Sequence, residues 1–175
     1  VLGLLFSAAC ADADLTTGPV AGDLDDDAIT AVAAPAPAAA AAPDLLPCPT
    51  PARGSATGLF RVLGGVLRLD GHQMRLPFLA ILRPTRFEME VPASRHLEVT
   101  IHAVGHASFE FRRPARVTVD YSHCPAAEIP DAPLHVWHVD PVTGTPLEHM
   151  GGIDDRAART ITFETDHLST FSLAR

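Results

Sequence analysis

The chain has 175 residues, 16 of them proline, and a formal net charge of −8. Because proline and a long alanine-rich tract limit the part that can pack, we expect one core of about 120 residues. The negative charge lies mainly in residues 11–50, which contain aspartates and no basic residue. Arginines and carboxylates nearly balance in the remainder, which excludes the basic stripe that nucleic-acid binding requires.

The N-terminus predicts export. Residues 1–9 are mostly apolar and end in small residues, as in a signal peptide, although the usual positive segment is missing and we treat the signal as incomplete. Ser7-Ala8-Ala9-Cys10 resembles a bacterial lipobox, which implies that Cys10 is diacylated and becomes the mature N-terminus. Two or more acyl chains anchor a protein durably to a membrane. The alternative is an ordinary signal peptide cut after Ala11-Asp12-Ala13, which gives a soluble secreted protein.

Residues 10–53 predict a disordered linker. The stretch 31–51 is mainly alanine and proline, and the part before it is rich in aspartate, glycine and threonine. Such a segment buries too little apolar area to offset the entropy lost on ordering. Proline-rich chains favour polyproline II, at about 3.1 Å per residue. We therefore expect a stalk that holds the domain away from its anchor.

Two cysteines remain once Cys10 is lipidated. Cys48 stands at the end of the linker, and Cys124 follows a predicted strand. In an oxidising compartment two cysteines predict one disulfide, which would link the base of the linker covalently to the domain. The alternative is two unpaired thiols whose side chains never meet.

Residues 54–175 predict an all-β fold, because short alternating runs are separated by turn residues. Asp70-Gly71 stands between the runs 66–69 and 73–76, which is a strong hairpin signal. The other expected strands are 86–91, 97–103, 117–121, 134–139, 161–163 and 171–173. Seven or eight short strands indicate an antiparallel β-sandwich. The one helix-like segment is 154–159.

Several short motifs follow one another in this domain. They are Gly64-Gly65-Val66-Leu67-Arg68-Leu69, Leu76-Pro77, Ala80-Ile81-Leu82, Pro84-Thr85, Phe111, Pro114, Val117-Thr118-Val119-Asp120-Tyr121 and His167-Leu168-Ser169. Their order resembles the ZU-type domain, a β-sandwich of ankyrins, netrin receptors, zonula occludens proteins and bacterial envelope proteins, over about residues 58–174. Pro77-Phe78-Leu79-Ala80 stands where that family usually has Pro-Pro-Gly-Ala. The resemblance implies an interaction module.

One segment near the C-terminus suggests self-cleavage. Asp166-His167-Leu168-Ser169-Thr170-Phe171 resembles the His-Leu-Ser motif at which GAIN domains of adhesion receptors cut themselves. The resemblance implies that His167 takes the Ser169 proton and the hydroxyl attacks the Leu168 carbonyl, after which water cleaves the ester. The alternative is that His167 and Ser169 are turn residues at the entry to the last strand, while Leu168 and Phe171 pack in the core.

Nine histidines raise the question of a metal site. The candidates are His102 with His106, His123 beside Cys124, and His135 with His138. On a strand His135 and His138 point to opposite faces, and no His-Glu-x-x-His or paired Cys-x-x-Cys motif occurs. We therefore expect no metal and no cofactor, with His102 and His106 facing solvent.

Together these features favour a non-catalytic binding or structural module of the cell envelope. The chain has no Gly-x-Ser-x-Gly motif and no lysine for a Ser-x-x-Lys pair. We expect an exported protein anchored by Cys10 at the periplasmic or outer cell surface. Its expected partners are membrane lipid and an envelope protein or glycan whose identity the sequence does not give, and no nucleic acid. The alternative function is a self-processing sandwich that cleaves the Leu168–Ser169 peptide by an N-to-O acyl shift.

Overall fold

The computed structural model describes residues 43–50 and 54–175 of the chain. The expected signal peptide at 1–9, Cys10 and residues 11–42 of the linker lie outside the described residues. In the described part, thirteen strands form three antiparallel sheets, which confirms the predicted all-β sandwich. The strands outnumber the seven or eight expected because several short ones have no buried face to mark them. No helix among these residues is long and apolar enough to cross a membrane.

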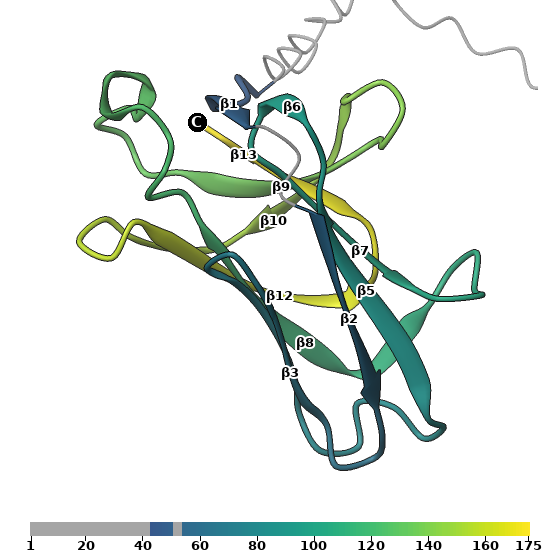
Figure 1. The fold of residues 1–175 in the computed structure, drawn as a ribbon. Coiled ribbons are helices and arrows are strands. Elements are labelled where there is room, and N and C mark those ends of the chain that lie inside the picture. The colour runs from purple at the N-terminus through teal and green to yellow at the C-terminus, as the bar shows by residue number, and fades with distance from the viewer. Residues whose placement is uncertain (1–42, 51–53) are drawn as a thin grey trace, which may run out of the picture. The chain divides into compact units, whose positions relative to one another are not determined.

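The larger sheet has six strands in the order β10-β9-β13-β7-β5-β2 (Figure 1). Its strands are β2 (Gly54–Phe60), β5 (Thr85–Val91), β7 (Glu98–Ala103), β9 (His135–Val139), β10 (Pro146–Gly151) and β13 (Thr170–Ala174). The last strand of the chain, β13, lies inside this sheet and pairs with β7 on one side and β9 on the other. All of its residues are buried, as a strand covered on both faces requires.

The second sheet has five strands in the order β11-β12-β8-β4-β3. Its strands are β3 (Gly65–Leu69), β4 (His72–Leu76), β8 (Glu110–Asp120), β11 (Ile153–Asp155) and β12 (Thr160–His167). The predicted hairpin is confirmed, since β3 and β4 pair around Asp70 and Gly71, whose φ angles are 48° and 89°. Positive φ at both central residues is typical of a two-residue hairpin turn, and Gly71 also leaves room for the Asp120 carboxylate.

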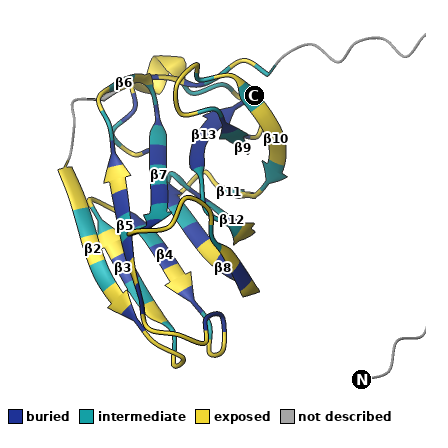
Figure 2. Cartoon of the chain, turned by 90° about the vertical axis from the view of Figure 1, so that its right-hand side faces the viewer, coloured by how far each residue is buried: buried dark blue, intermediate teal, exposed yellow. Residues whose placement is uncertain are grey.

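One hydrophobic core lies between these two sheets. Along β5 the residues Thr85, Phe87, Met89 and Val91 are buried, and the residues between them are more exposed. Figure 2 shows this alternation along the strands of both sheets. Because each strand has one buried face, a slip of one residue in its pairing would expose its apolar side chains.

Residues 43–50 belong to the folded part of the chain. Strand β1 (Pro47–Thr50) pairs with β6 (Ser94–His96) in the two-stranded sheet, and the Leu46 amide donates to the Leu173 carbonyl at 2.8 Å. Cys48 and Cys124 form a disulfide. The folded part therefore begins before Gly54, where we placed the end of the linker. Leu46 and Cys48 are both buried in the core.

The segment 154–159 is not helical. Its first residues belong to β11 and the rest form a turn, and the only helical element among the described residues is the short 3₁₀ helix Ala126–Glu128. Asp154 has a role in the core, because its side chain is only 5% exposed. It accepts hydrogen bonds from the Tyr121 hydroxyl at 2.5 Å and the Leu134 amide at 3.0 Å, and it pairs with Arg156 Nε at 2.6 Å.

This cluster joins two separate segments, those of Tyr121 and Leu134, to one carboxylate. Burial, followed by the hydrogen bond to Asp154, raises the pKa of Tyr121 well above its usual range. The same guanidinium, that of Arg156, donates to the Pro130 and Ala132 carbonyls, so the loop before β9 is fixed to β11. A buried carboxylate with three donors is stable only while all of them are present.

We predict that Asp154→Ala lowers the free energy of unfolding by about 3 kcal/mol or more, because it leaves three donors without their acceptor. Tyr121→Phe should cost about 1–2 kcal/mol, since it removes one bond to a charged group. Asp155→Ala is the matched control at the exposed neighbouring position and should cost about 1 kcal/mol or less. Urea denaturation measures the free energy of unfolding of the three variants, provided that the m-value is unchanged. Equal losses of stability in all three would contradict the role assigned to Asp154.

Candidate functional site

His167-Leu168-Ser169 lies at the passage from β12 to β13. The Leu168 amide donates to the Phe109 carbonyl at 3.3 Å, and the Ser169 carbonyl accepts from the Ile101 amide at 2.9 Å. Leu168 packs against the hydrophobic core. The residues of the predicted cleavage motif therefore form the entry to the last strand, which is the arrangement of the plainer alternative.

The imidazole of His167 faces carboxylates. Its Nδ1 lies 3.0 Å from Asp166 Oδ1, a hydrogen bond that lowers the pKa of the Asp166 carboxyl, and its Nε2 lies 4.0 Å from Glu148 Oε2. Among the described residues, no hydrogen bond joins this imidazole to the Ser169 hydroxyl. Self-cleavage at Leu168–Ser169 stays a prediction that this arrangement does not specifically favour, because the proposed base is not bonded to its nucleophile.

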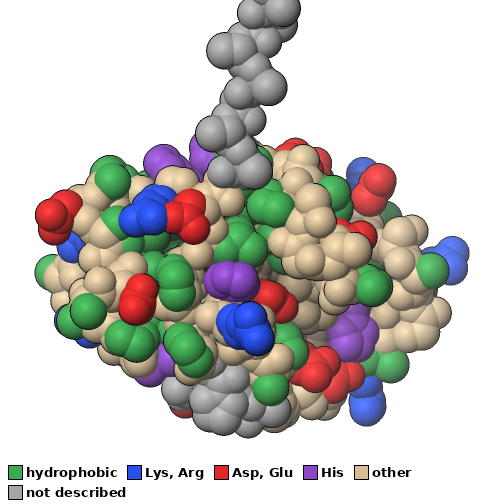
Figure 3. Space-filling model, turned by 90° about the horizontal axis from the view of Figure 1, so that it is seen from above, with side chains coloured by type: hydrophobic (Ala, Val, Ile, Leu, Met, Phe, Trp, Pro, Cys, Tyr) green, Lys and Arg blue, Asp and Glu red, His purple; other side chains and the backbone are tan. Residues whose placement is uncertain are grey.

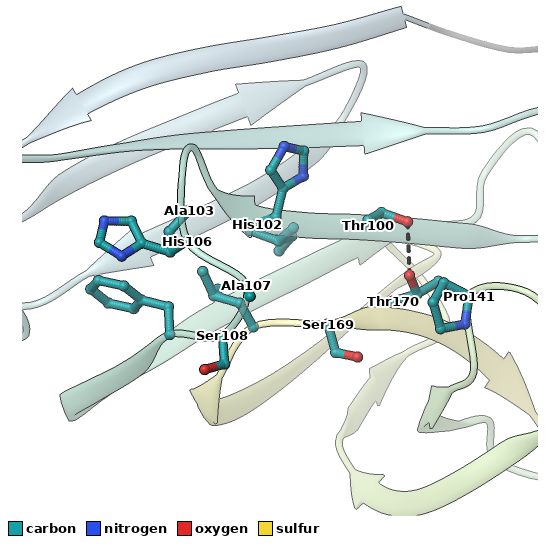
Figure 4. A pocket seen from close by; sticks show the side chains of 12 residues that line it. Thr100, His102, Ala103, His106, Ala107, Ser108, Pro141, Ser169 and Thr170 are labelled. Atoms are coloured by element: carbon teal, nitrogen blue, oxygen red, sulfur yellow. Dashed lines mark hydrogen bonds between the residues drawn. The ribbon is translucent and has the colours of Figure 1, made fainter.

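Ser169 also lines a pocket of about 240 Å³ beside β7 (Figure 4). The Thr100 and Thr170 hydroxyls lie 3.0 Å apart at one side of it. In Figure 4 the rings of His102 and His106 and the hydroxyl of Ser169 point in different directions. A binding site for a small molecule needs polar groups that converge on one position. The polar groups of this pocket do not form such a site.

The pairs of histidines that the sequence singled out have separate neighbours. His102 Nε2 lies 3.3 Å from Glu88 Oε2, and the His106 ring packs edge-on to Phe109 at 5.7 Å. The His135 ring lies 5.1 Å from that of His149. In the third candidate set, His123 lies near Cys48 and Cys124, whose sulfurs are joined in the disulfide.

A different group of side chains converges at the edge of the larger sheet. One ligand atom from each of His138, Glu148 and His167 lies within 4.8 Å of the others. Desolvation by burial, followed by the nearby His167, lowers the pKa of His138. No local sequence pattern marks this group, because its members come from β9, β10 and the end of β12 and share no spacing motif. Only the pairing of the strands brings them together.

At one end of the sandwich, two loops expose large apolar side chains. We call this surface the apolar tip and define it by Val62 and Leu63 in the β2–β3 turn and by Phe78, Leu79 and Leu82 in the β4–β5 loop. Leu63 is 77% exposed and Phe78 52%. Isolated exposed leucines are common, but adjacent apolar side chains that are this exposed are typical of interaction surfaces.

The backbone of the apolar tip is held by hydrogen bonds. The Leu79 amide donates to the Val62 carbonyl at 2.8 Å, which joins the two loops, and Arg113 Nη1 donates to the Phe78 carbonyl at 3.2 Å. Gly64 has a φ of 77°, and a Cβ there would lie 2.2 Å from the Leu76 carbonyl oxygen. The turn can approach the other loop only because residue 64 has no side chain.

The opposite end of the sandwich has a different surface. It contains β1, β6 and the C-terminus (Figure 1). Figure 3 looks onto this end, and the side chains in view are a mixture of hydrophobic, acidic, basic and histidine residues.

Comparison with known proteins gives no match: neither a protein-family model nor a curated protein sequence matches this chain.

The lowered pKa of His138 predicts a pH-dependent stability. Its ring faces His167, Glu148 and Asp140, and burial disfavours its charged form most. The unfolded imidazole titrates near pH 6.5 and the folded one below that value. The unfolded state therefore binds more protons in this window, so the free energy of unfolding falls as the pH falls below about 6.5.

We predict that His138→Gln reduces this loss of stability on acidification, as measured by urea denaturation at a series of pH values. Val142→Gln, at a non-titrating position that is 90% exposed in the β9–β10 turn, is the control and should follow the parent protein. Equal pH profiles for the parent and His138→Gln would contradict the assignment. The lowered pKa values of Asp140 and Asp166 act at more acidic pH and do not disturb this window.

Proposed function

We propose that this protein is a non-catalytic interaction module of the cell envelope, and that the apolar tip is its binding surface. An acyl anchor at Cys10 and the linker that follows it would attach the module to a membrane. The observation that carries the proposal is the exposure of five large apolar side chains on two loops joined by a hydrogen bond.

Leu79 supports a functional role for the apolar tip. It adopts a φ of 64°, in the left-handed region that costs a residue with a Cβ about 1–2 kcal/mol. This conformation persists because the Leu79 amide is bonded to Val62 and the neighbouring residues Ala80 and Ile81 are buried. Strained residues held by their surroundings cluster at functional sites. The strain here presents a leucine at the surface.

The arginines around the apolar tip indicate the chemistry of the partner. Arg61 and Arg83 lie in the two loops, and Arg112 and Arg113 lie on the adjoining part of β8. Apolar anchors surrounded by arginine are typical of protein–protein interfaces, in which arginine and aromatic residues are enriched. We therefore expect a protein partner with an apolar surface that is bordered by carboxylates.

The position of the apolar tip suits a module on a tether. Strand β2 pairs with β5 from Gly54 opposite Val91 to Phe60 opposite Thr85, and seven residues of strand span about 20 Å. Strands β1 and β6 lie beyond the Val91 end, where the disulfide also holds Cys48. The described chain therefore enters the domain at the end opposite the apolar tip.

The resemblance to ZU-type domains agrees with this proposal, since those domains act as interaction modules. In that family glycine usually stands at the position of Leu79, and the φ of 64° is one that glycine adopts without strain. This agreement concerns one turn and supports the resemblance only there.

We predict that the double variant Leu63→Glu/Phe78→Glu loses its partner. The measurement is in-cell photocrosslinking at the apolar tip, followed by affinity capture of the full-length protein. The amount of one specific partner that is captured should fall at least 10-fold, because the loss of an interface anchor costs about 1.4 kcal/mol or more of binding free energy. Both side chains are exposed, so the fold should be retained.

Val142→Glu is the matched control, because Val142 is 90% exposed in the β9–β10 turn and lies outside the apolar tip. It should capture the partner as the parent does. Capture that is unchanged in the double variant, or no specific partner from intact cells, would overturn the proposal. Binding of the purified protein to anionic lipid vesicles through the same side chains would also overturn it, because the occupant would then be a membrane surface.

A further inference from the structure

We propose that His138, Glu148 and His167 bind one divalent transition-metal ion, of which Zn²⁺ is the best match. The inference is independent of the proposed function, and none of the histidine pairs singled out in the sequence contains this set. One imidazole comes from β9, the carboxylate from β10 and the second imidazole from the end of β12. Two imidazoles and one carboxylate form a donor set that suits Zn²⁺, with a fourth position left for water.

The pairing of the strands brings the three donors together. Glu148 lies opposite His138 in the β10–β9 ladder, so these two side chains are direct cross-strand neighbours. The His167 ring lies 5.4 Å from the His138 ring, and its Nε2 lies 4.0 Å from Glu148 Oε2. Around a tetrahedral Zn²⁺ the donor atoms lie about 3.4 Å apart. To bind the ion, the donor atoms therefore need to move only slightly closer together. The Glu148 side chain can make this movement because it is 59% exposed.

Asp166 orients His167 for this role. Its Oδ1 lies 3.0 Å from His167 Nδ1, which leaves Nε2 as the nitrogen directed at Glu148. A histidine that ligates a metal usually donates its other ring N–H to a carboxylate, which fixes the tautomer and the orientation of the ring. Asp166 is thus a positioning residue and not a ligand.

Phe171 forms an apolar floor beneath both imidazoles. Its ring lies 6.4 Å from that of His138 and 6.4 Å from that of His167, and its side chain is buried in the core. Both rings therefore lie beside a fixed side chain of the core, while the Glu148 side chain is 59% exposed. Flexible side chains that cluster on a surface without a buried neighbour would not be held in place in this way.

Two other groups of potential ligands are less suitable. Cys48, His123 and Cys124 lie close together, but the disulfide occupies both thiolates that a metal would need. The rings of His135 and His149 lie 5.1 Å apart, and neither residue belongs to a group of three potential ligands among the described residues. His149 is therefore a useful control, because it offers an exposed imidazole one residue away from Glu148.

The experiment titrates ZnCl₂ into the full-length protein without a histidine tag, after chelation and dialysis, by isothermal calorimetry. We expect one ion per chain. His138→Ala and His167→Ala should each weaken binding by more than about 100-fold, and Asp166→Asn by about 10-fold, as expected for loss of an outer-shell partner. His149→Ala and His102→Ala should bind as the parent does.

Two further measurements keep the result interpretable. Circular dichroism of each metal-free variant shows whether it is folded, and the visible absorption of bound Co²⁺ reports whether nitrogen and oxygen donors surround the ion. Binding that survives in His138→Ala and His167→Ala, binding that is lost in His149→Ala, or no binding by the folded parent protein would each overturn the proposal.

Discussion

The pairing of strand β13 is the constraint on which the rest of the domain depends. This strand joins β10-β9 to β7-β5-β2, so without it the larger sheet would be two unconnected pieces. Its pairing partners lie far away in the chain, as Thr170 opposite Thr100 illustrates. The same strand binds the start of the folded part, because Leu45 bridges to Ala174 and the Leu46 amide donates to the Leu173 carbonyl. Such long-range pairing forms late and slowly, so the domain closes only when its C-terminus is in place.

The residues just before β13 contain the predicted cleavage motif and one of the proposed metal ligands, His167. A cut at Leu168–Ser169 would leave residues 169–175 bound as a paired strand, so cleavage alone would not unfold the sandwich. The imidazole of His167, however, is bonded to Asp166 and directed at Glu148. One nitrogen cannot both bind a metal there and take a proton from the Ser169 hydroxyl. The arrangement of His167 therefore does not specifically favour cleavage at Leu168–Ser169.

The parts of the fold that sequence predicts are those with strong local signals. Asp70-Gly71 indicated the hairpin, and the alternation of Val99 and Ile101 with polar residues indicated a half-buried strand. Strand β2 was missed because its glycine, serine and threonine residues show no alternation, and β10 because its residues are not fully buried. The apolar tip could not be recognised, because the sequence does not show whether a leucine such as Leu63 is buried or exposed. The cluster of His138, Glu148 and His167 depends on long-range pairing that no local pattern records.

The central claim is that this chain is an exported, lipid-anchored and uncut interaction module, and intact mass spectrometry tests it most directly. The protein would be expressed with its complete signal in a bacterial host and measured under denaturing, non-reducing conditions. The account predicts a chain that starts at acylated Cys10, retains residues 169–175 and has lost two hydrogens to the Cys48–Cys124 disulfide. A chain that starts at Asp14 without acyl groups would contradict the anchor. Loss of the seven C-terminal residues would contradict the uncut module and establish self-cleavage.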